Sequence, residues 1–144
     1  MIFFKTIFVI YVTYSISVIL HELAHFICAK LMRLKNVDIY IGEKFLAINI
    51  KRFHFSPLIT SGYVEFDLNS LIIKKNWQII IFYMAGAFAN ILIILISLII
   101  MPYTKYSIYI VLVNVFCVLT NLFPLKKLHN DFGNCFLVFG KKRT

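Results

Sequence analysis

Three long apolar segments dominate the chain, and the stretches between them carry most of its charge. The segments are residues 7–28, 77–101 and 106–123. A helix rises about 1.5 Å per residue, so about 20 residues cross the hydrocarbon core of a bilayer. The pattern therefore predicts an α-helical membrane protein with three transmembrane helices.

The first apolar segment must be distinguished from a secretory signal peptide. Only Lys5 provides a positive charge before it, and no small-residue cleavage site follows the apolar core. The segment also continues through Cys28, which makes it longer than the apolar region of a signal peptide. We therefore interpret it as a retained helix.

Between the first and second helices, apolar and polar residues alternate. The alternating stretches are 37–41, 46–51 and 59–67, and Gly42-Glu43-Lys44 resembles a short turn between the first two. A period of two is typical of strands with one buried face. The pattern predicts a small antiparallel sheet within residues 37–68, lying at the membrane surface, with Val64 and Phe66 on one face.

Composition supports a membrane protein and limits its size. The chain has 144 residues, of which 61% are hydrophobic and 15% charged, with a mean hydropathy of +0.87. This is more apolar than a soluble domain of this size. We expect one domain over residues 1–144, in contact with the lipid bilayer.

The net charge of +9 is explained by membrane topology better than by nucleic-acid binding. Residues 30–75 carry eight Lys or Arg and residues 126–143 carry five, against Lys5 and Lys105 elsewhere. Basic residues concentrate in cytoplasmic loops. We expect a multi-pass protein of the bacterial cell membrane with its N-terminus outside, its C-terminus cytoplasmic and no nucleic-acid partner.

The first helix contains His21-Glu22-Leu23-Ala24-His25, which has the H-E-x-x-H form. Ionisable side chains are costly inside a membrane, so they indicate function rather than a chance match. Residues four apart share one face of a helix, so His21 and His25 can bind one metal ion. Glu22 beside them suits the general base of a zinc protease.

A catalytic zinc ion usually has three protein ligands and a water. His129 and Asp131 follow the third helix on the side that presents the motif, and either is suitable. Cys28, seven residues after His21, is a weaker alternative. The three cysteines are Cys28, Cys117 and Cys135, whose odd number and spacing fit no disulfide framework, so we interpret them as packing residues.

The second helix contains the small residues Ala85, Gly86 and Ala87, followed by Asn90. Small residues let another helix approach closely, and an amide within hydrocarbon needs a hydrogen-bonding partner. His21 and Gly86 each lie roughly 13 Å from the cytoplasmic end of their helix. We expect the metal motif and the small residues at similar depths.

Taken together, these motifs resemble the site-2 protease family of intramembrane zinc metalloproteases, as a minimal three-helix core. His21 to His25 match the first motif, and Gly62-Tyr63-Val64 match the element before the second core helix. In the Ala-Gly-Pro-x-x-Asn motif Ala87 replaces Pro. In the closing motif Asn121 and Pro124 match, but the Asp is displaced by two residues to Asp131, His129 occupies the usual spacing, and Phe132 separates Asp131 from Gly133.

The resemblance implies that Asp131 completes a Zn2+ site with His21 and His25, with His129 as the alternative third ligand. The zinc ion would activate a water and polarise the scissile carbonyl, and Glu22 would move the proton. The candidates for contacting the oxyanion or the substrate are Asn90, Asn121, Gly62 and Tyr63. The substrates would be membrane-spanning or membrane-associated peptides or proteins, and an exposed strand near Tyr63 would hold them extended.

A different class of function is a non-catalytic membrane protein whose protease-like site binds a peptide partner or a metal. The displaced Asp131 and the Ala87 that replaces Pro favour this alternative. Glu22 argues against it, because a binding protein does not need a general base.

Overall fold

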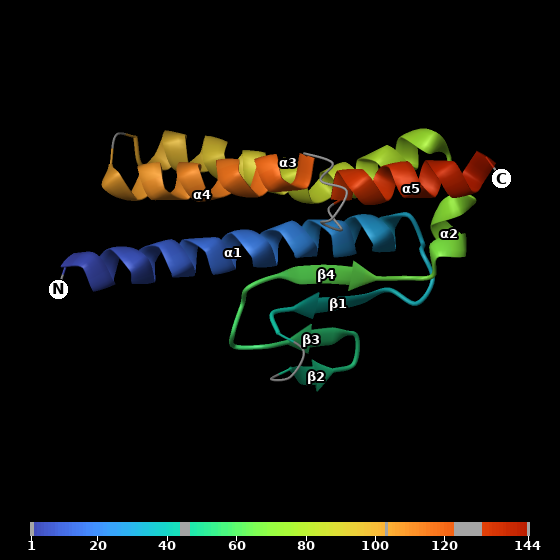
Figure 1. Ribbon diagram of the computed structural model, residues 1–144, viewed down its shortest axis with the longest axis horizontal. Helices are drawn as coiled ribbons and strands as arrows, with labels where there is room; N and C mark the ends of the chain where they lie inside the picture. Colours follow the sequence, from blue (N-terminus) through green and yellow to red (C-terminus); the bar gives the residue numbers. More distant parts are fainter. Residues whose placement is uncertain (1, 44–46, 103, 123–130, 144) are drawn as a thin grey trace.

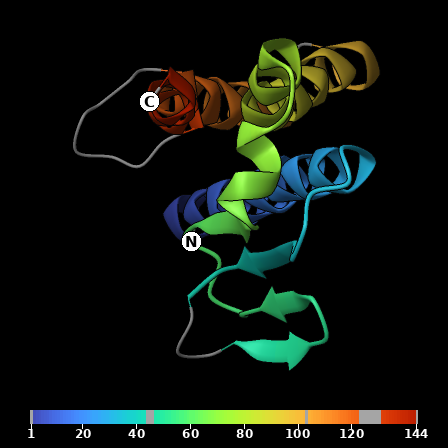
Figure 2. The same cartoon turned by 90° about the vertical axis from the view of Figure 1, so that its right-hand side faces the viewer.

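The computed structural model of the chain describes residues 2–43, 47–102, 104–122 and 131–143. The elements in order are α1 (Ile2–Leu31), β1 (Asp38–Ile41), β2 (Ile48–Ile50), β3 (Phe53–Phe55), β4 (Gly62–Glu65), α2 (Leu68–Ile72), α3 (Asn76–Ile100), α4 (Lys105–Leu122) and α5 (Asp131–Arg143). They form layers, with the sheet on one side of α1 and the helices α3, α4 and α5 on the other (Figures 1 and 2).

The three expected long helices are confirmed as α1, α3 and α4. Each is long and apolar enough to cross a membrane. Their outer surfaces are apolar as well, because side chains such as Phe4 and Ile99 are 75% and 78% exposed. Such a surface suits lipid rather than water. The helix α1 extends beyond the predicted segment at both ends, from Ile2 to Leu31.

The sheet has four strands in the order β2-β3-β1-β4 and is mixed. β1 runs antiparallel to β4 but parallel to β3, and β2 and β3 form an antiparallel pair. The prediction of a wholly antiparallel sheet was therefore wrong. The unpredicted strand β3 follows a tight reversal at Lys51, whose φ is 54°, and its three residues are too few to show a period of two.

The sheet packs along the second half of α1 rather than beyond its end (Figure 1). Two tyrosines of α1 tether the segment that leads into β4. Tyr14 Oη donates to the carbonyl oxygen of Thr60 at 2.7 Å, and Tyr11 Oη accepts from the backbone N–H of Ile59 at 3.2 Å. Tyr14 is about 25 Å along the helix from Leu31. These contacts place β4 beside the middle of α1.

An apolar core lies where the C-terminal end of α1 meets the helices α2, α3 and α5. Its buried members are Ala29, Leu34, Val37, Leu71, Ile79, Phe82, Tyr83, Cys135 and Val138. Val64 and Phe66 pack against it, as the alternation predicted. The helix α5 was not predicted, and it lies along α3 beyond the end of α4 (Figure 1). The core therefore fixes where the first residue of α5 lies.

Candidate metal centre

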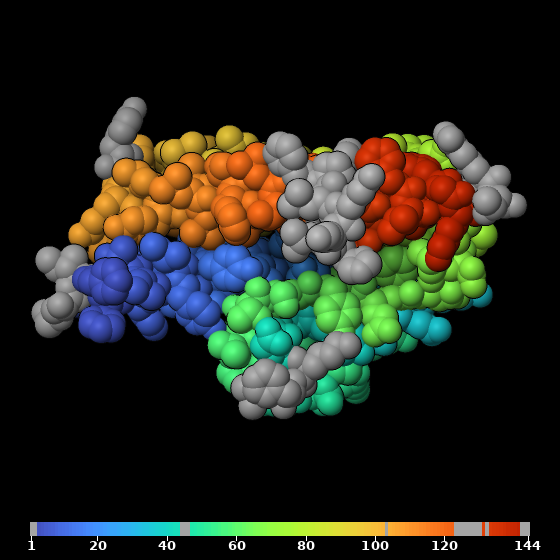
Figure 3. Space-filling model, in the orientation of Figure 1, coloured from blue at the N-terminus to red at the C-terminus, as the bar shows by residue number. Residues whose placement is uncertain are grey.

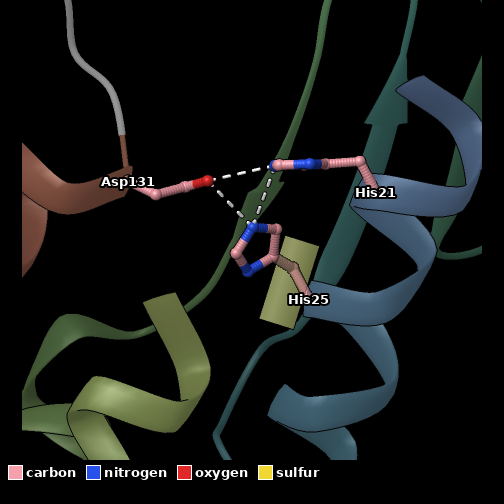
Figure 4. Close-up of side chains that lie close together, drawn as sticks. All are labelled: His21, His25 and Asp131. Atoms are coloured by element: carbon pink, nitrogen blue, oxygen red, sulfur yellow. Dashed lines mark hydrogen bonds and ion pairs between the residues drawn. The ribbon is translucent and has the colours of Figure 1, made fainter. Parts of the chain in front are cut away.

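The side chains of His21 and His25 project from one face of α1 toward Asp131, the first residue of α5 (Figure 4). The Nε2 atoms of His21 and His25 are 3.0 Å and 3.1 Å from Oδ2 of Asp131. The two Nε2 atoms are 3.3 Å from each other. Residues 106 or more positions apart in the sequence therefore converge on one point.

The surroundings of Asp131 favour its carboxylate form. Burial raises the pKa of Asp131, but the contacts of its carboxylate with the imidazoles of His21 and His25 outweigh burial and hold the pKa well below its usual range. The N-terminus of α5 adds to this effect, because the helix dipole favours a negative charge in the first turn.

The three side chains fit a metal ion. His25 Nδ1 lies 2.8 Å from the carbonyl oxygen of Phe82, which can only accept a hydrogen bond, so a neutral His25 carries its proton there. Its Nε2 then presents a lone pair to the carboxylate of Asp131, and two such acceptors need a cation between them. All three ligand atoms lie within 4.8 Å of one another. Donor atoms around a tetrahedral zinc ion are roughly 3.3 Å apart, close to these separations.

Among the described residues, the candidate metal ligands are those three alone. Cys28 packs near the apolar core and is not one of them. Cys117 and Cys135 are buried, and all three thiols are free of disulfides. His129, the alternative third ligand, lies outside the described residues.

Glu22 lies beside the metal ligands without being one of them. Its side chain is 8% exposed and lines the same cavity as His21 and His25. Gly62 at the start of β4 packs against it, because a Cβ atom at position 62 would lie 2.5 Å from Glu22 Cγ. A carboxylate in this place shares the cavity with the candidate ligands, where a general base would be needed.

A cavity of about 460 Å³ surrounds these residues. Elements from every layer contribute to its wall, among them Tyr63 of β4, Phe82 of α3 and Thr120 of α4. Asn134, one turn after Asp131, also lines it and was missed by the sequence analysis, which did not predict the helix that carries it. Figure 3 shows α4 above α1 and α5 further along the same layer, with the sheet below them.

The two asparagines proposed to contact substrate both line the cavity but have different surroundings. Asn121 Nδ2 donates to the carbonyl oxygen of Cys117 at 2.9 Å. Asn90 is completely buried, and its Nδ2 lies 3.2 Å from Nδ1 of His21. Asn90 therefore contacts His21 at the ring nitrogen that faces away from Asp131. A role of Asn90 or Asn121 in contacting the substrate stays a prediction.

The edge of β4 that faces away from β1 presents backbone N–H and C=O groups with which a further extended segment could pair. The N–H of Gly42 donates to the carbonyl oxygen of Ser61 at 2.8 Å, so Ser61 directs its backbone toward the neighbouring strand. Hydrogen-bonding direction alternates along a strand. Gly62 and Val64 therefore direct their N–H and C=O groups outward, and both residues line the cavity.

Three stacked rings brace this edge. Tyr40 of β1 lies between His54 and Tyr63, with ring centroids 4.1 Å and 4.7 Å away and planes within 8° of parallel. The 4.7 Å between the Tyr40 and Tyr63 rings matches the spacing of neighbouring strands, about 4.7–4.9 Å. Tyr63 is thus held on the face of the sheet while its own strand forms the edge.

Comparison with known proteins identifies one family. The family model of peptidase family M50 matches residues 8–107. The matched region includes the His21–His25 motif, Gly62 and Asn90, and it ends before Asn121 and Asp131. No curated protein and no solved structure gives a significant match.

Proposed function

Because this chain belongs to peptidase family M50, the site-2 protease family, we propose that it is an intramembrane zinc metalloprotease. It would hydrolyse peptide bonds in membrane-spanning or membrane-associated peptides and proteins. The observation that carries this proposal is the convergence of His21, His25 and Asp131, with Glu22 beside them inside a cavity. The three distances among the ligand atoms support a single ion.

The membrane setting is supported by the surfaces of α1, α3 and α4. Exposed phenylalanine, leucine and isoleucine side chains cover their outer faces. The ligands lie in the middle of the layered structure, about 15 Å along α1 from Leu31 to His21. In the bilayer this would bring the reaction to a peptide within the membrane, with the N-terminus of the chain outside and its C-terminus cytoplasmic.

The chemistry divides between the metal and one carboxylate. Bound by His21, His25 and Asp131, a zinc ion would supply an acidified water and would polarise the scissile carbonyl. Glu22 would take the proton of the attacking water and then pass it to the amine of the leaving fragment. The position of Gly62 against Glu22 limits where that carboxylate can move.

The substrate must be extended at the point of cleavage, because a helix holds its carbonyl groups in hydrogen bonds. We propose that the extended segment pairs with the outward edge of β4, where Gly62 and Val64 offer backbone groups. Strand addition of this kind derives its affinity from main-chain hydrogen bonds. Since β4 contacts Glu22 and lines the same cavity as the candidate metal ligands, a paired segment would lie beside them.

The function is tested with purified protein supplied with Zn2+ and a library of peptides of known sequence. Cleavage is read by mass spectrometry for the wild type and for Glu22→Gln. We expect products that appear with the wild type and are absent with the variant. Zinc binding without any Glu22-dependent product would instead support the non-catalytic alternative, in which the site only binds metal or peptide.

A further inference from the structure

The helix α3 presents three positions, spaced four residues apart, to the two histidines of α1. They are Phe82, Gly86 and Asn90. His25 Nδ1 lies 2.8 Å from the carbonyl oxygen of Phe82, and His21 Nδ1 lies 3.2 Å from Nδ2 of Asn90. Each imidazole therefore turns Nδ1 toward α3 and Nε2 toward the metal position.

Gly86 makes this approach possible. A Cβ atom at position 86 would overlap the imidazole of His21, whose ring atoms are its nearest neighbours. A helical side chain also covers the turn N-terminal to its own Cα, which here is the turn that exposes the Phe82 carbonyl. The missing side chain thus leaves room for both imidazoles, and the close helix approach expected from the small residues is confirmed.

The proton on each imidazole decides whether its Nε2 can bind metal. His25 has its Nδ1 proton fixed by the carbonyl of Phe82, which leaves a lone pair on Nε2. Among the described residues, Asn90 Nδ2 occupies the equivalent place beside His21 Nδ1. When Asn90 Nδ2 donates to His21 Nδ1, a neutral ring must carry its proton on Nε2, where it points at Asp131.

We propose that Asn90 is a positioning residue that sets the tautomer of His21. If the carboxamide of Asn90 turns over, Oδ1 takes the place of Nδ2 beside His21. Oδ1 then accepts a hydrogen bond from Nδ1–H of His21, and the lone pair on Nε2 of His21 is free to bind the metal. The rotation would give this oxygen a partner, since Asn90 Oδ1 is buried and has no hydrogen-bond partner among the described residues. An amide suits both tautomers, because one end donates and the other accepts.

This inference rests on the metal site of the proposed function but not on peptide cleavage. A partner on the second imidazole nitrogen orients a metal-binding histidine, and losing it costs about 10–100-fold in metal affinity. We therefore expect Asn90→Leu to weaken zinc binding by about that factor. Asn90→Asp, which keeps an acceptor for the Nδ1 proton, should bind zinc at least as tightly as the wild type.

Asn114 provides a matched control on α4. It is also completely buried, and its Nδ2 donates to the carbonyl oxygen of Ile110 at 2.8 Å. Its Oδ1 likewise has no partner in the part of the chain that the structure describes. Asn114→Leu therefore removes a buried amide that does not touch the imidazoles. It should leave zinc affinity unchanged.

The affinities are measured by competition with a chromophoric chelator, and thermal unfolding without zinc establishes that each variant is folded. Weaker binding by Asn90→Leu together with wild-type binding by Asn90→Asp supports the assignment. Equal affinities for Asn90→Leu and Asn114→Leu overturn it, and so does a comparable loss in Asn90→Asp. Failure of the wild type to bind zinc would instead refute the metal site itself.

Discussion

Gly62 of β4 and Glu22 of α1 pack so closely that only glycine fits between the strand and the carboxylate. A Cβ atom at position 62 would lie 2.5 Å from Glu22 Cγ and 3.1 Å from Cδ. The same Cβ atom would lie 3.1 Å from the carbonyl oxygen of Tyr40. The neighbouring strand β1 therefore restricts how far β4 could move away from Glu22. The sheet thus restrains the residue proposed as the general base.

The first prediction follows from this contact. Gly62→Ala should displace the Glu22 side chain while leaving His21, His25 and Asp131 in place. A misplacement of about 1 Å in a catalytic group can cost roughly 100-fold in rate. We expect kcat to fall by that order with zinc affinity unchanged, measured on a peptide cleaved by the wild type.

Gly140 of α5 serves as the control for adding a methyl group. A Cβ atom at position 140 meets nothing within 4 Å. Gly140→Ala should keep wild-type activity and raise the free energy of unfolding by about 0.5–1 kcal/mol, because alanine is the better helix former. Equal activity in Gly62→Ala and Gly140→Ala would show that the strand does not restrain the base.

The second prediction separates metal binding from proton transfer. His21→Ala and His25→Ala should each lose bound zinc, because two ligands are too few to hold the ion. Glu22→Gln keeps both imidazoles and should retain zinc while losing about 10²–10⁴-fold in cleavage rate. Metal content by atomic emission and turnover by mass spectrometry are the measurements. A fully active Glu22→Gln would refute the proposed mechanism.

The third prediction concerns the third ligand. Asp131→Ala should weaken zinc binding sharply, because its Oδ2 lies 3.0 Å and 3.1 Å from the two Nε2 atoms. His129→Ala should change the affinity little. Zinc titration of both variants ranks the two candidates, and the reverse order would assign the ligand to His129.

The sequence predicted the three long helices well because their physical cause is local. Crossing a bilayer requires a long apolar run, and α3 and α4 begin and end within one residue of the apolar segments at 77–101 and 106–123. Likewise, His21 and His25 share a helix face wherever that helix lies in the fold. The metal motif and its base could therefore be read from five consecutive residues.

The sheet order and the neighbours of the motif could not be read in this way, because distant contacts decide them. Pairing of β3 with β1 depends on the backbone of Arg52, whose carbonyl oxygen accepts from Ile39 N–H at 2.9 Å. The contact of Asn90 with His21 joins residues 69 positions apart. The spacing of residues within one segment therefore cannot predict the pairing of β3 with β1 or the contact of Asn90 with His21.

The fourth prediction concerns orientation in the membrane. The helices α1 and α4 begin at one end of the layered structure, and α1 ends and α3 begins at the other (Figure 1). By sequence, Lys5 and Lys105 belong to the first end, and Lys30, Lys35 and Lys75 to the second. Basic residues favour the cytoplasmic side. Reporter fusions should therefore label the C-terminus as cytoplasmic and the N-terminus as external. A cytoplasmic N-terminus would contradict the charge asymmetry.

The last prediction tests substrate pairing at the edge of β4. Val64 directs its N–H away from β1, so Val64→Pro removes one outward donor while the pairing of β4 with β1 remains. Proline is tolerated on the outer side of an edge strand. A hydrogen bond contributes about 1 kcal/mol net, so kcat/KM should fall by roughly 5-fold or more.

Val64→Ala is the matched control for that change, because it shortens the same side chain but keeps the N–H. It should retain most of the wild-type kcat/KM, and both variants should bind zinc normally, since neither alters a ligand. If Val64→Pro and Val64→Ala cleave the same peptide equally well, the substrate does not pair with β4. A loss in Val64→Pro alone, with zinc affinity intact, assigns the backbone of this strand to substrate binding.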